Sequence, residues 1–273
     1  MSEALKSVSV LRVRAGRGTR ETDRAAVEEP LEIRLHGRPF AVIMRTPGAD
    51  RELAAGFLLA EGVVTSADEL GAISHCTDQS TDHFENIVNV TLVNGSEARL
   101  ERILAGRRHV TTTASCGLCG RQTIESLAVD MRPIEADWTV RGTDLAQFAD
   151  RLRSVQPVFE ATGGLHAAGL FKPGGGLVET AEDVGRHNAV DKVIGRMLML
   201  EALPLSAHVL FVSGRSSFEI VQKAFLGGIP VVASVSAPSS LAIDLAEHVN
   251  ITLAGFVRGD SFNIYTHPHR IVG

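Results

Sequence analysis

The pattern of hydrophobic and polar residues changes near residue 160 of the chain. Before that point, short stretches alternate as strands do, and two of them flank His36-Gly37 in LEIRLHGRPFAVIMRT. Alternation on both sides of a two-residue turn predicts a β-hairpin. NIVNVTLVNG alternates in the same way and predicts another strand. Residues 1–29 are charged and weakly patterned, so we expect a loosely ordered arm with one strand near Val8–Val13.

Helical spacing predicts two helices in the same half of the chain. Leucine and phenylalanine recur on one face of ADRELAAGFLLAEG, where Asp50 would cap the helix and Gly62 would end it. GTDLAQFADRLRSVQ has the same kind of pattern and predicts a helix capped by Thr143.

After residue 160, apolar strands and amphipathic helices follow one another. AAGLF and GLVETAEDVG predict strands around a triple-glycine turn, and HNAVDKVIGRMLMLEA predicts a helix. HVLFVSG, SSFEIVQKAFLGG, PVVASVS and SSLAIDLAEHV then alternate strand and helix, and ITLAGFVRG and SFNIYTH end the chain as strands. Such alternation builds a layered α/β domain with parallel strands. We therefore expect an N-terminal α+β region over 30–155 and a C-terminal α/β core over 156–273.

Composition narrows the class of protein. The chain has 273 residues, 44% hydrophobic and 22% charged, as expected for one or two globular domains. The net charge of −5 argues against a general nucleic-acid binder. No stretch has the apolar core of a signal peptide or the roughly 18 apolar residues of a membrane span. We expect a cytoplasmic protein without nucleic-acid or membrane partners.

The stretch TTTASCGLCGRQTIES holds the most reactive candidate residues, Cys116 and Cys119. A structural zinc site needs about four ligands, and only one such cysteine pair is present. A permanent disulfide is disfavoured in a reducing compartment. The pair lies among polar residues and glycines, which argues for an exposed loop rather than for buried core cysteines. No resident metal is expected.

A nucleophilic or redox-active thiol remains as the functional interpretation of this pair. The reactive form is the thiolate, which a nearby cation or a helix N-terminus stabilises. Arg121 and the helix predicted after Cys119 supply both features. A thioredoxin-type oxidoreductase would use the same pair, but its motif follows the first strand of its fold, whereas here more than a hundred residues come first.

The stretch TGGLHAAGL invites comparison with the zinc deaminases. Those enzymes carry H-x-E followed by P-C-x-x-C, with the glutamate as acid and base. Here His166 is followed by Ala167 and Ala168, and the only C-x-x-C precedes it. The zinc chemistry therefore lacks its ligands, although a deaminase-like sheet remains compatible with the pattern.

Four motifs together resemble the formate dehydrogenase accessory sulfurtransferase family. They are SCGLCGRQ, TGGLHAAGL, EDVGRHNAVDKVIG and SGRSSFEIVQKA, and the tail SAPSSLAIDLAE…ITLAGFVRGDSFNIYTH extends the resemblance over about residues 30–268. The resemblance implies a cytidine-deaminase-like mixed-sheet core, a smaller β-rich N-terminal domain and a homodimer.

The resemblance also implies a chemical role. Such proteins take persulfide sulfur from a cysteine desulfurase and pass it to the molybdenum cofactor, bis-molybdopterin guanine dinucleotide, for formate dehydrogenase. The carrier cysteine of the family corresponds to Cys116, and Cys119 would be auxiliary. The cofactor-binding segment of the family corresponds to Phe262, Asn263, Ile264, Tyr265, Thr266 and His267.

A second candidate for cofactor binding comes from the residues themselves. VSGRSS forms a strand-to-helix turn of the kind that binds phosphate, where a GMP or GDP moiety could bind by itself. The candidates are Gly214, Arg215, Ser216 and Ser217, with Asp183, Arg186 and His187 of the neighbouring EDVGRHN motif. A plain helix cap with a solvated arginine is the alternative for this loop.

Two other functions remain open at this point. One is a non-catalytic chaperone that binds a cofactor or a guanine nucleotide and has a structural cysteine pair. The other is a thiol–disulfide oxidoreductase.

Overall fold

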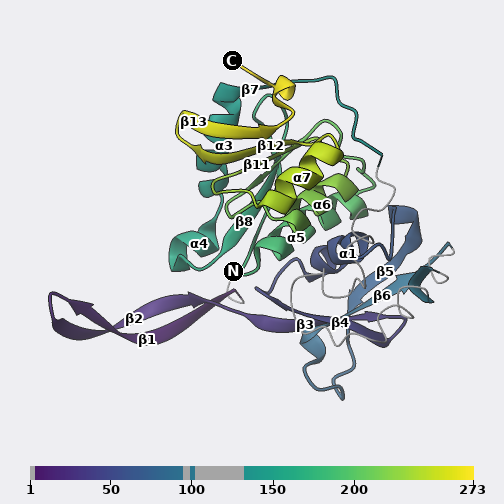
Figure 1. Cartoon of the computed structure of the whole chain (residues 1–273). Coiled ribbons are helices and arrows are strands. Elements are labelled where there is room, and N and C mark those ends of the chain that lie inside the picture. The colour runs from purple at the N-terminus through teal and green to yellow at the C-terminus, as the bar shows by residue number, and fades with distance from the viewer. Residues whose placement is uncertain (1–3, 95–98, 102–131) are drawn as a thin grey trace.

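The structure is a computed structural model, and it describes residues 4–94, 99–101 and 132–273 (Figure 1). Two larger sheets organise these residues. One has four strands in the order β4-β3-β6-β5, and the other has six in the order β13-β12-β11-β10-β8-β9. The expected mixed α/β architecture with a smaller β-rich N-terminal region is confirmed.

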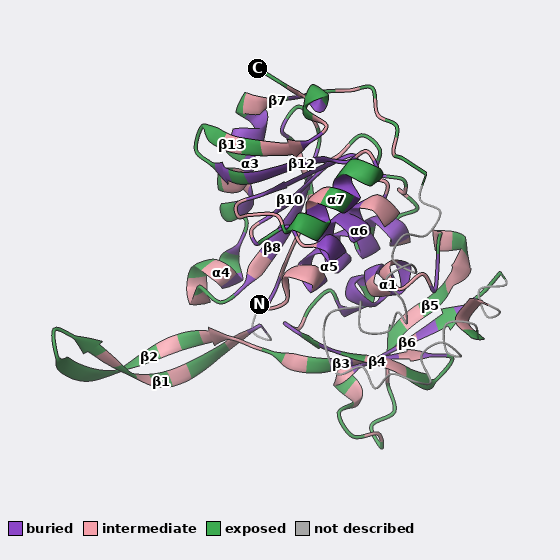
Figure 2. Cartoon of the chain, in the orientation of Figure 1, coloured by how far each residue is buried: buried purple, intermediate pink, exposed green. Residues whose placement is uncertain are grey.

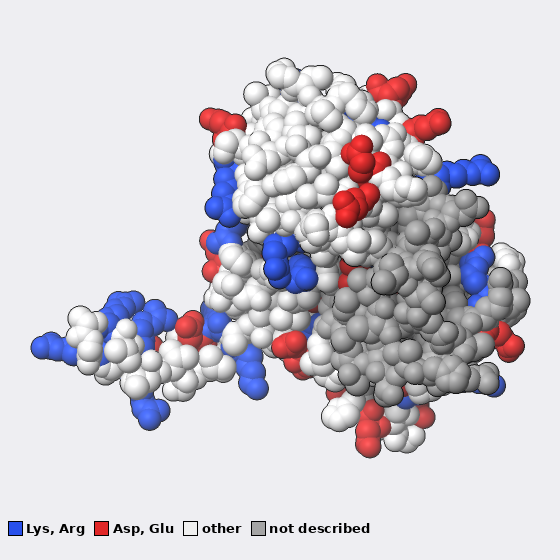
Figure 3. All heavy atoms as spheres, in the orientation of Figure 1, with Lys and Arg blue, Asp and Glu red and all other residues white. Residues whose placement is uncertain are grey.

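The N-terminal arm is a regular hairpin that projects from the rest of the chain (Figure 1). Strands β1 (Leu5–Arg14) and β2 (Arg17–Ala26) pair in antiparallel register along their whole length. The expectation of a loosely ordered arm with one strand is therefore wrong. Both faces of the hairpin are largely exposed, so its sequence lacks the alternation that reveals a half-buried strand. Lysine and arginine side chains gather on this arm in Figure 3.

The four-stranded sheet contains the predicted hairpin. Strands β3 (Glu29–Leu35) and β4 (Arg38–Arg45) are joined by His36 and Gly37, whose φ angles are 50° and 76°. Positive φ at both turn positions is the geometry that suits the twist of a two-residue hairpin. The remaining strands of this sheet are β5 (Leu70–His75) and β6 (Ile87–Leu92). Strand β6 confirms the strand predicted in NIVNVTLVNG.

Both predicted N-terminal caps differ in the structure. Helix α1 (Asp50–Ala60) begins with Asp50 as its first helical residue, and that carboxylate is bound by Arg45 at 2.9 and 3.0 Å instead of capping the helix. Helix α3 (Gly142–Arg153) begins before Thr143, which makes no cap bond. At Asp50, a buried ion pair with Arg45 uses the side chain that would otherwise cap the helix.

The six-stranded sheet confirms the alternation of strands and helices in the second half. Its three central strands run parallel and its other strands are antiparallel. The strands are β8 (His166–Phe171), β9 (Leu177–Asp183), β10 (Val209–Val212), β11 (Val231–Ser234), β12 (Thr252–Arg258) and β13 (Ser261–Thr266). The helices that follow them or connect them are α5 (Arg186–Met199), α6 (Phe218–Leu226) and α7 (Ser240–His248).

Three other short elements of the described part of the chain are helix α4 (Pro157–Thr162) and strands β7 (Val140–Arg141) and β14 (Ile271–Val272). Helix α4 leads into β8 and contacts the base of the hairpin arm. Strands β7 and β14 form a parallel pair that joins the end of the chain to the start of α3.

Two hydrophobic clusters cover opposite faces of the six-stranded sheet. One face packs against α3 around Phe148, Phe171 and Phe211, which are fully buried. The other face packs against α5, α6 and α7, and its cluster continues through α1 into the four-stranded sheet (Figure 2). The N-terminal and C-terminal regions thus share one core, and the division at residue 155 stays a prediction.

Candidate functional site

The predicted sulfur site lies outside the described residues. This applies to both Cys116 and Cys119. Cys76, which lies within the described part, is half-buried and free. Residues 4–94, 99–101 and 132–273 contain no group of three histidine, cysteine or acidic side chains that could hold a metal ion. The candidate site is therefore built from the other motifs.

Three of the sequence motifs meet at one edge of the six-stranded sheet, where the parallel strands end. His166 begins β8 and pairs in register with Asp183, the last residue of β9. Ser213 follows β10 and bonds to β8 through its backbone and its hydroxyl. A β-carbon at Gly214 would lie 3.4 Å from His166 Nδ1 and 3.5 Å from Arg186 Cδ. The glycine therefore lets the loop after β10 approach both side chains closely.

Asp183 has a structural role at this edge. It is fully buried, and Lys192 Nζ lies 2.7 Å from its carboxylate. The backbone N–H groups of Thr46 and Gly185 and the amide of Asn188 also donate to it. Asp183, a sequence-based candidate for cofactor binding, is therefore not available to a ligand, because its acceptors are occupied and solvent does not reach it.

Several polar atoms at this edge lack partners among the described residues. Arg186 Nε and Ser216 Oγ are buried and make no hydrogen bond. Arg215 is exposed, and no ion pair of its side chain is found in the described part of the chain. Helices α5 and α6 both begin here without a side-chain cap. Uncapped helix N-termini beside arginines favour an anion.

His187 connects the two helix starts. Its Nε2 lies 3.0 Å from Ser217 Oγ, and its Nδ1 lies 3.1 Å from Glu219 Oε2. The two groups lie side by side, although the Glu219 oxygen accepts no well-directed hydrogen bond from a described group. Ser217 and His187, both predicted as site residues, are thus brought together across thirty positions of sequence.

A buried charge cluster supports Glu219, and the sequence analysis missed it. Lys223 Nζ lies 3.5 Å from Glu219 Oε1 and 2.7 Å from Asp191 Oδ1. Burial raises the pKa of Asp191 to about 7 against the opposing effect of Lys223. Burial also raises the pKa of Glu219. A glutamate and a lysine four residues apart inside the apolar run FEIVQKAF were the available signal.

A cavity of about 510 Å³ opens at the same edge on the α3 side of the sheet. His166 and Ser213 line it, together with Gln156, Phe159 and Val235. Burial, followed by the positive charge of Arg186, lowers the pKa of His166 against the opposing effect of Asp183. A half-buried histidine of this kind is neutral at physiological pH and offers one donor and one acceptor to a bound group.

The predicted cofactor segment at the end of the chain forms β13 and the turn after it. Asn263 is exposed, and Phe262 and Ile264 are half-buried. Thr266 is buried, and its hydroxyl bonds to the backbone of Ile251 and Leu253. His267 leaves the strand with φ 46°. Asn263 is available to a ligand in this arrangement, whereas Thr266 is engaged in holding the strand.

Tyr265 lies near the loop that carries Ser216. A β-carbon at Gly255 would lie 3.2 Å from the Tyr265 ring and 3.1 Å from Pro238. Pro238 pairs with Ser216 through an isolated bridge. The two segments predicted to bind cofactor, the tail and the Gly214–Ser217 loop, therefore flank the same Pro238 loop.

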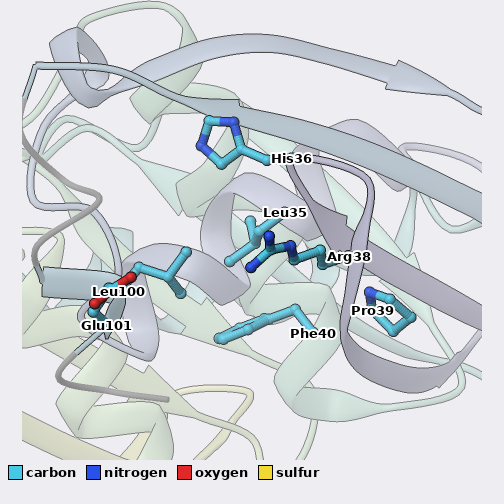
Figure 4. A pocket seen from close by; sticks show the side chains of 7 residues that line it. All are labelled: Leu35, His36, Arg38, Pro39, Phe40, Leu100 and Glu101. Carbon is cyan, nitrogen blue, oxygen red and sulfur yellow. The ribbon is translucent and has the colours of Figure 1, made fainter. Parts of the chain in front are cut away.

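A second cavity, of about 320 Å³, lies at the β3–β4 hairpin turn and away from these motifs (Figure 4). Leu35, Phe40 and Leu100 supply its apolar wall, and His36, Arg38 and Glu101 its polar groups. None of the sequence-predicted site residues lines it.

The chain is similar over most of its length to proteins of one family. Residues 26–272 match the model of the FdhD/NarQ family. A sulfur carrier protein FdhD of Streptomyces avermitilis is 49% identical over 279 residues, which covers 99% of this chain and 97% of the relative. The sulfur carrier protein FdhD of Anaeromyxobacter dehalogenans strain 2CP-C is 49% identical over 255 residues, which covers 91% and 88%.

A solved structure has the same overall fold. The crystal structure of a Desulfotalea psychrophila protein, assigned as a formate dehydrogenase accessory protein, matches with a TM-score of 0.78 and 26% identity. The match covers 98% of this chain and all of that chain. Within the described residues, no helix is both long enough and apolar enough to cross a membrane.

Proposed function

The chain belongs to the FdhD/NarQ family, and we propose on that premise that it is a sulfur carrier that serves formate dehydrogenase. The observation that carries this proposal is the 49% identity to sulfur carrier proteins over nearly the full length of both chains. The Desulfotalea psychrophila structure, a formate dehydrogenase accessory protein by assignment, supports the choice of target enzyme.

The proposed carrier is Cys116. The terminal sulfur of a desulfurase persulfide passes to the Cys116 thiolate, and the desulfurase cysteine leaves as a thiolate. Rates of such exchanges depend on the thiolate fraction and on access to the sulfur. The sequence supports this role because glycines follow both cysteines and Arg121 is close in the chain. Cys119 is auxiliary in this proposal.

The proposed sulfur acceptor is the molybdenum cofactor, bis-molybdopterin guanine dinucleotide, bound as a substrate at the strand edge. Its phosphates would bind at the Gly214–Ser216 turn, beside Arg215 and Arg186. The unpartnered Arg186 Nε and Ser216 Oγ support this fit, because a bound phosphate would give both buried atoms an acceptor. The helix N-termini add favourable partial charge.

The tail would hold another part of the same ligand. Asn263 and Tyr265 are proposed to line it, since Asn263 is exposed and Tyr265 flanks the Pro238 loop. Phe262, Ile264, Thr266 and His267 would then support the strand more than they contact the ligand. The proposal is supported by the position of both segments beside the same Pro238 loop.

Persulfide loading tests this function directly. The full chain is incubated with a cysteine desulfurase and cysteine, and mass spectrometry of the peptides locates added sulfur. We expect one sulfur atom on Cys116 in the wild type and in the control Cys76→Ala, and none in Cys116→Ala. Cys116→Ala should also fail to activate formate dehydrogenase.

The outcomes separate the alternative functions. A chain that binds cofactor but never gains sulfur would be a non-catalytic chaperone. Turnover of dithiols without sulfur would indicate an oxidoreductase. A cytoplasmic location and a homodimer are further parts of the proposal, and gel filtration with light scattering tests the dimer.

A further inference from the structure

The side chains of Ser217, His187 and Glu219 form a spatial series of hydroxyl, imidazole and carboxylate. This is the arrangement that makes a serine hydroxyl nucleophilic. The hydroxyl lies 3.0 Å from one imidazole nitrogen, and the carboxylate lies 3.1 Å from the other. A base against the hydroxyl and a carboxylate behind the base are the defining contacts of hydroxyl–imidazole–carboxylate triads, whatever the fold. Sulfur transfer by a cysteine uses none of these three groups.

The Ser217 hydroxyl is not used as a helix cap. Ser217 and Ser239 occupy equivalent places, because each precedes a helix that follows a parallel strand. Ser239 accepts a hydrogen bond from the backbone N–H of Ala242 at 3.3 Å, as capping serines do. Ser217 makes no such bond, and its hydroxyl meets His187 instead.

Backbone donors lie beside the Ser217 hydroxyl. The N–H groups in the first turn of α6, from Phe218 to Ile220, have no acceptor among the described residues. The first turn of a helix carries partial positive charge and unpaired donors. Such donors stabilise the oxyanion that forms when a hydroxyl attacks a carbonyl carbon.

The carboxylate is fixed behind the imidazole. Glu219 is 7% exposed, and Lys223 Nζ lies 3.5 Å from its Oε1. Its Oε2, which lies 3.1 Å from His187 Nδ1, is buried and accepts no directed hydrogen bond from a described group. This oxygen is therefore placed to stabilise the imidazolium that forms when His187 takes a proton.

We infer that Ser217 is a nucleophile that accepts acyl groups from carboxylic esters, with His187 as its base and Glu219 as a positioning residue. Ser217 Oγ bonds to the ester carbon as its proton moves to His187 Nε2. The bond from carbon to the alkoxy oxygen then breaks, and the departing alcohol takes that proton. Water hydrolyses the acyl-serine by the same route, so that ester and water give alcohol and acid. This activity is separate from sulfur transfer.

A covalent probe tests the inference. The full chain is treated with a biotinylated fluorophosphonate, and labelled peptides are mapped by mass spectrometry. We expect stoichiometric label on Ser217, none in Ser217→Ala, and labelling at least tenfold slower in His187→Gln and in Glu219→Gln. Ser239→Ala, which changes the equivalent cap, should label at the wild-type rate. Hydrolysis of p-nitrophenyl acetate should follow the same ranking.

The inference is overturned if the wild-type chain stays unlabelled, if label falls on another residue, or if His187→Gln labels as fast as wild type. Circular dichroism melting curves serve as the control that each variant is folded. Persulfide loading of Ser217→Ala on Cys116 should equal that of wild type. Failure of that loading would count against the separation of the two activities, whereas a wild-type chain that gains sulfur normally but takes no label would overturn the nucleophile alone.

Discussion

Gly56 of α1 and Gly195 of α5 face each other where the two helices cross. A β-carbon at Gly195 would lie 1.9 Å from the Glu52 carbonyl oxygen and 2.6 Å from the Gly56 nitrogen. A β-carbon at Gly56 would lie 2.0 Å from the Asp191 carbonyl oxygen. Backbone packs directly on backbone here, and this contact joins the N-terminal region to the C-terminal core.

Gly195→Ala should therefore destabilise the whole chain strongly. The methyl group would meet backbone atoms that cannot rotate away, so the helices must separate, at a cost of about 3 kcal/mol or more in the free energy of unfolding. Urea denaturation measures this cost. Gly174→Ala is the matched control, because nothing lies within 4 Å of a β-carbon there. Equal stability of both variants would contradict the close crossing of α1 and α5.

Asp191 should make the stability of the chain fall as pH rises from about 4 to about 7. Burial raises its pKa to about 7, from an ordinary value of 3.8. In that window the unfolded chain releases the proton that the folded chain keeps, so the unfolded state is favoured progressively. Asp191→Asn should remove this pH-dependent loss of stability, on the order of 1 to 4 kcal/mol across the window.

Chemical denaturation at pH 4.5 and pH 7.5 measures the effect of Asp191. The loss of stability between the two pH values should be smaller in Asp191→Asn than in wild type. Asp150→Asn, which changes an exposed carboxylate, should behave as wild type. The same pH dependence in all three proteins would rule out the proton held at Asp191.

Arg215→Ala should weaken binding of GDP by about 1.5 to 3 kcal/mol, as expected for loss of one hydrogen bond to a charged group. Arg215 is exposed, so the fold should not change. Isothermal titration calorimetry measures the affinity, and Arg51→Ala, another exposed arginine, is the control. Unchanged affinity in Arg215→Ala would leave Arg215 as a solvated side chain next to a helix start.

Asn263→Ala should lose bound molybdenum cofactor while Cys116 still gains sulfur from the desulfurase. The side chain is exposed and contributes no buried hydrogen bond, so the stability should stay within about 0.5 kcal/mol of wild type. Metal analysis of the purified protein measures occupancy. Tyr265→Ala tests the same surface but removes a ring packed near Gly255.

Thr266→Val provides the contrasting structural variant in the tail. It removes a hydroxyl that bonds to two backbone groups in a buried position, so it should cost about 1 to 3 kcal/mol of stability. If Asn263→Ala keeps normal cofactor occupancy, or if it loses persulfide loading instead, the assigned division between tail and cysteine loop is wrong.

The sequence by itself determined much of this protein. The β3–β4 hairpin followed from alternation around His36-Gly37, and the strands and helices after residue 160 followed from their apolar periodicity. Both signals arise because one face of each element is buried, and this burial gives the local sequence a periodic pattern of apolar residues. The family also followed from the sequence, because its motifs are short stretches of neighbouring residues.

The tertiary structure decided which partners the polar side chains take. Asp50 and Ser217 both stand where local rules place a helix cap, yet one binds Arg45 and the other meets His187. The charge cluster of Asp191, Glu219 and Lys223 likewise joins α5 to α6. Polar groups in a low-dielectric interior gain more from a buried opposite charge than from a local backbone bond. His187 lies 30 positions from Ser217 and Asp191 lies 32 positions from Lys223, so only the folded chain brings these groups together.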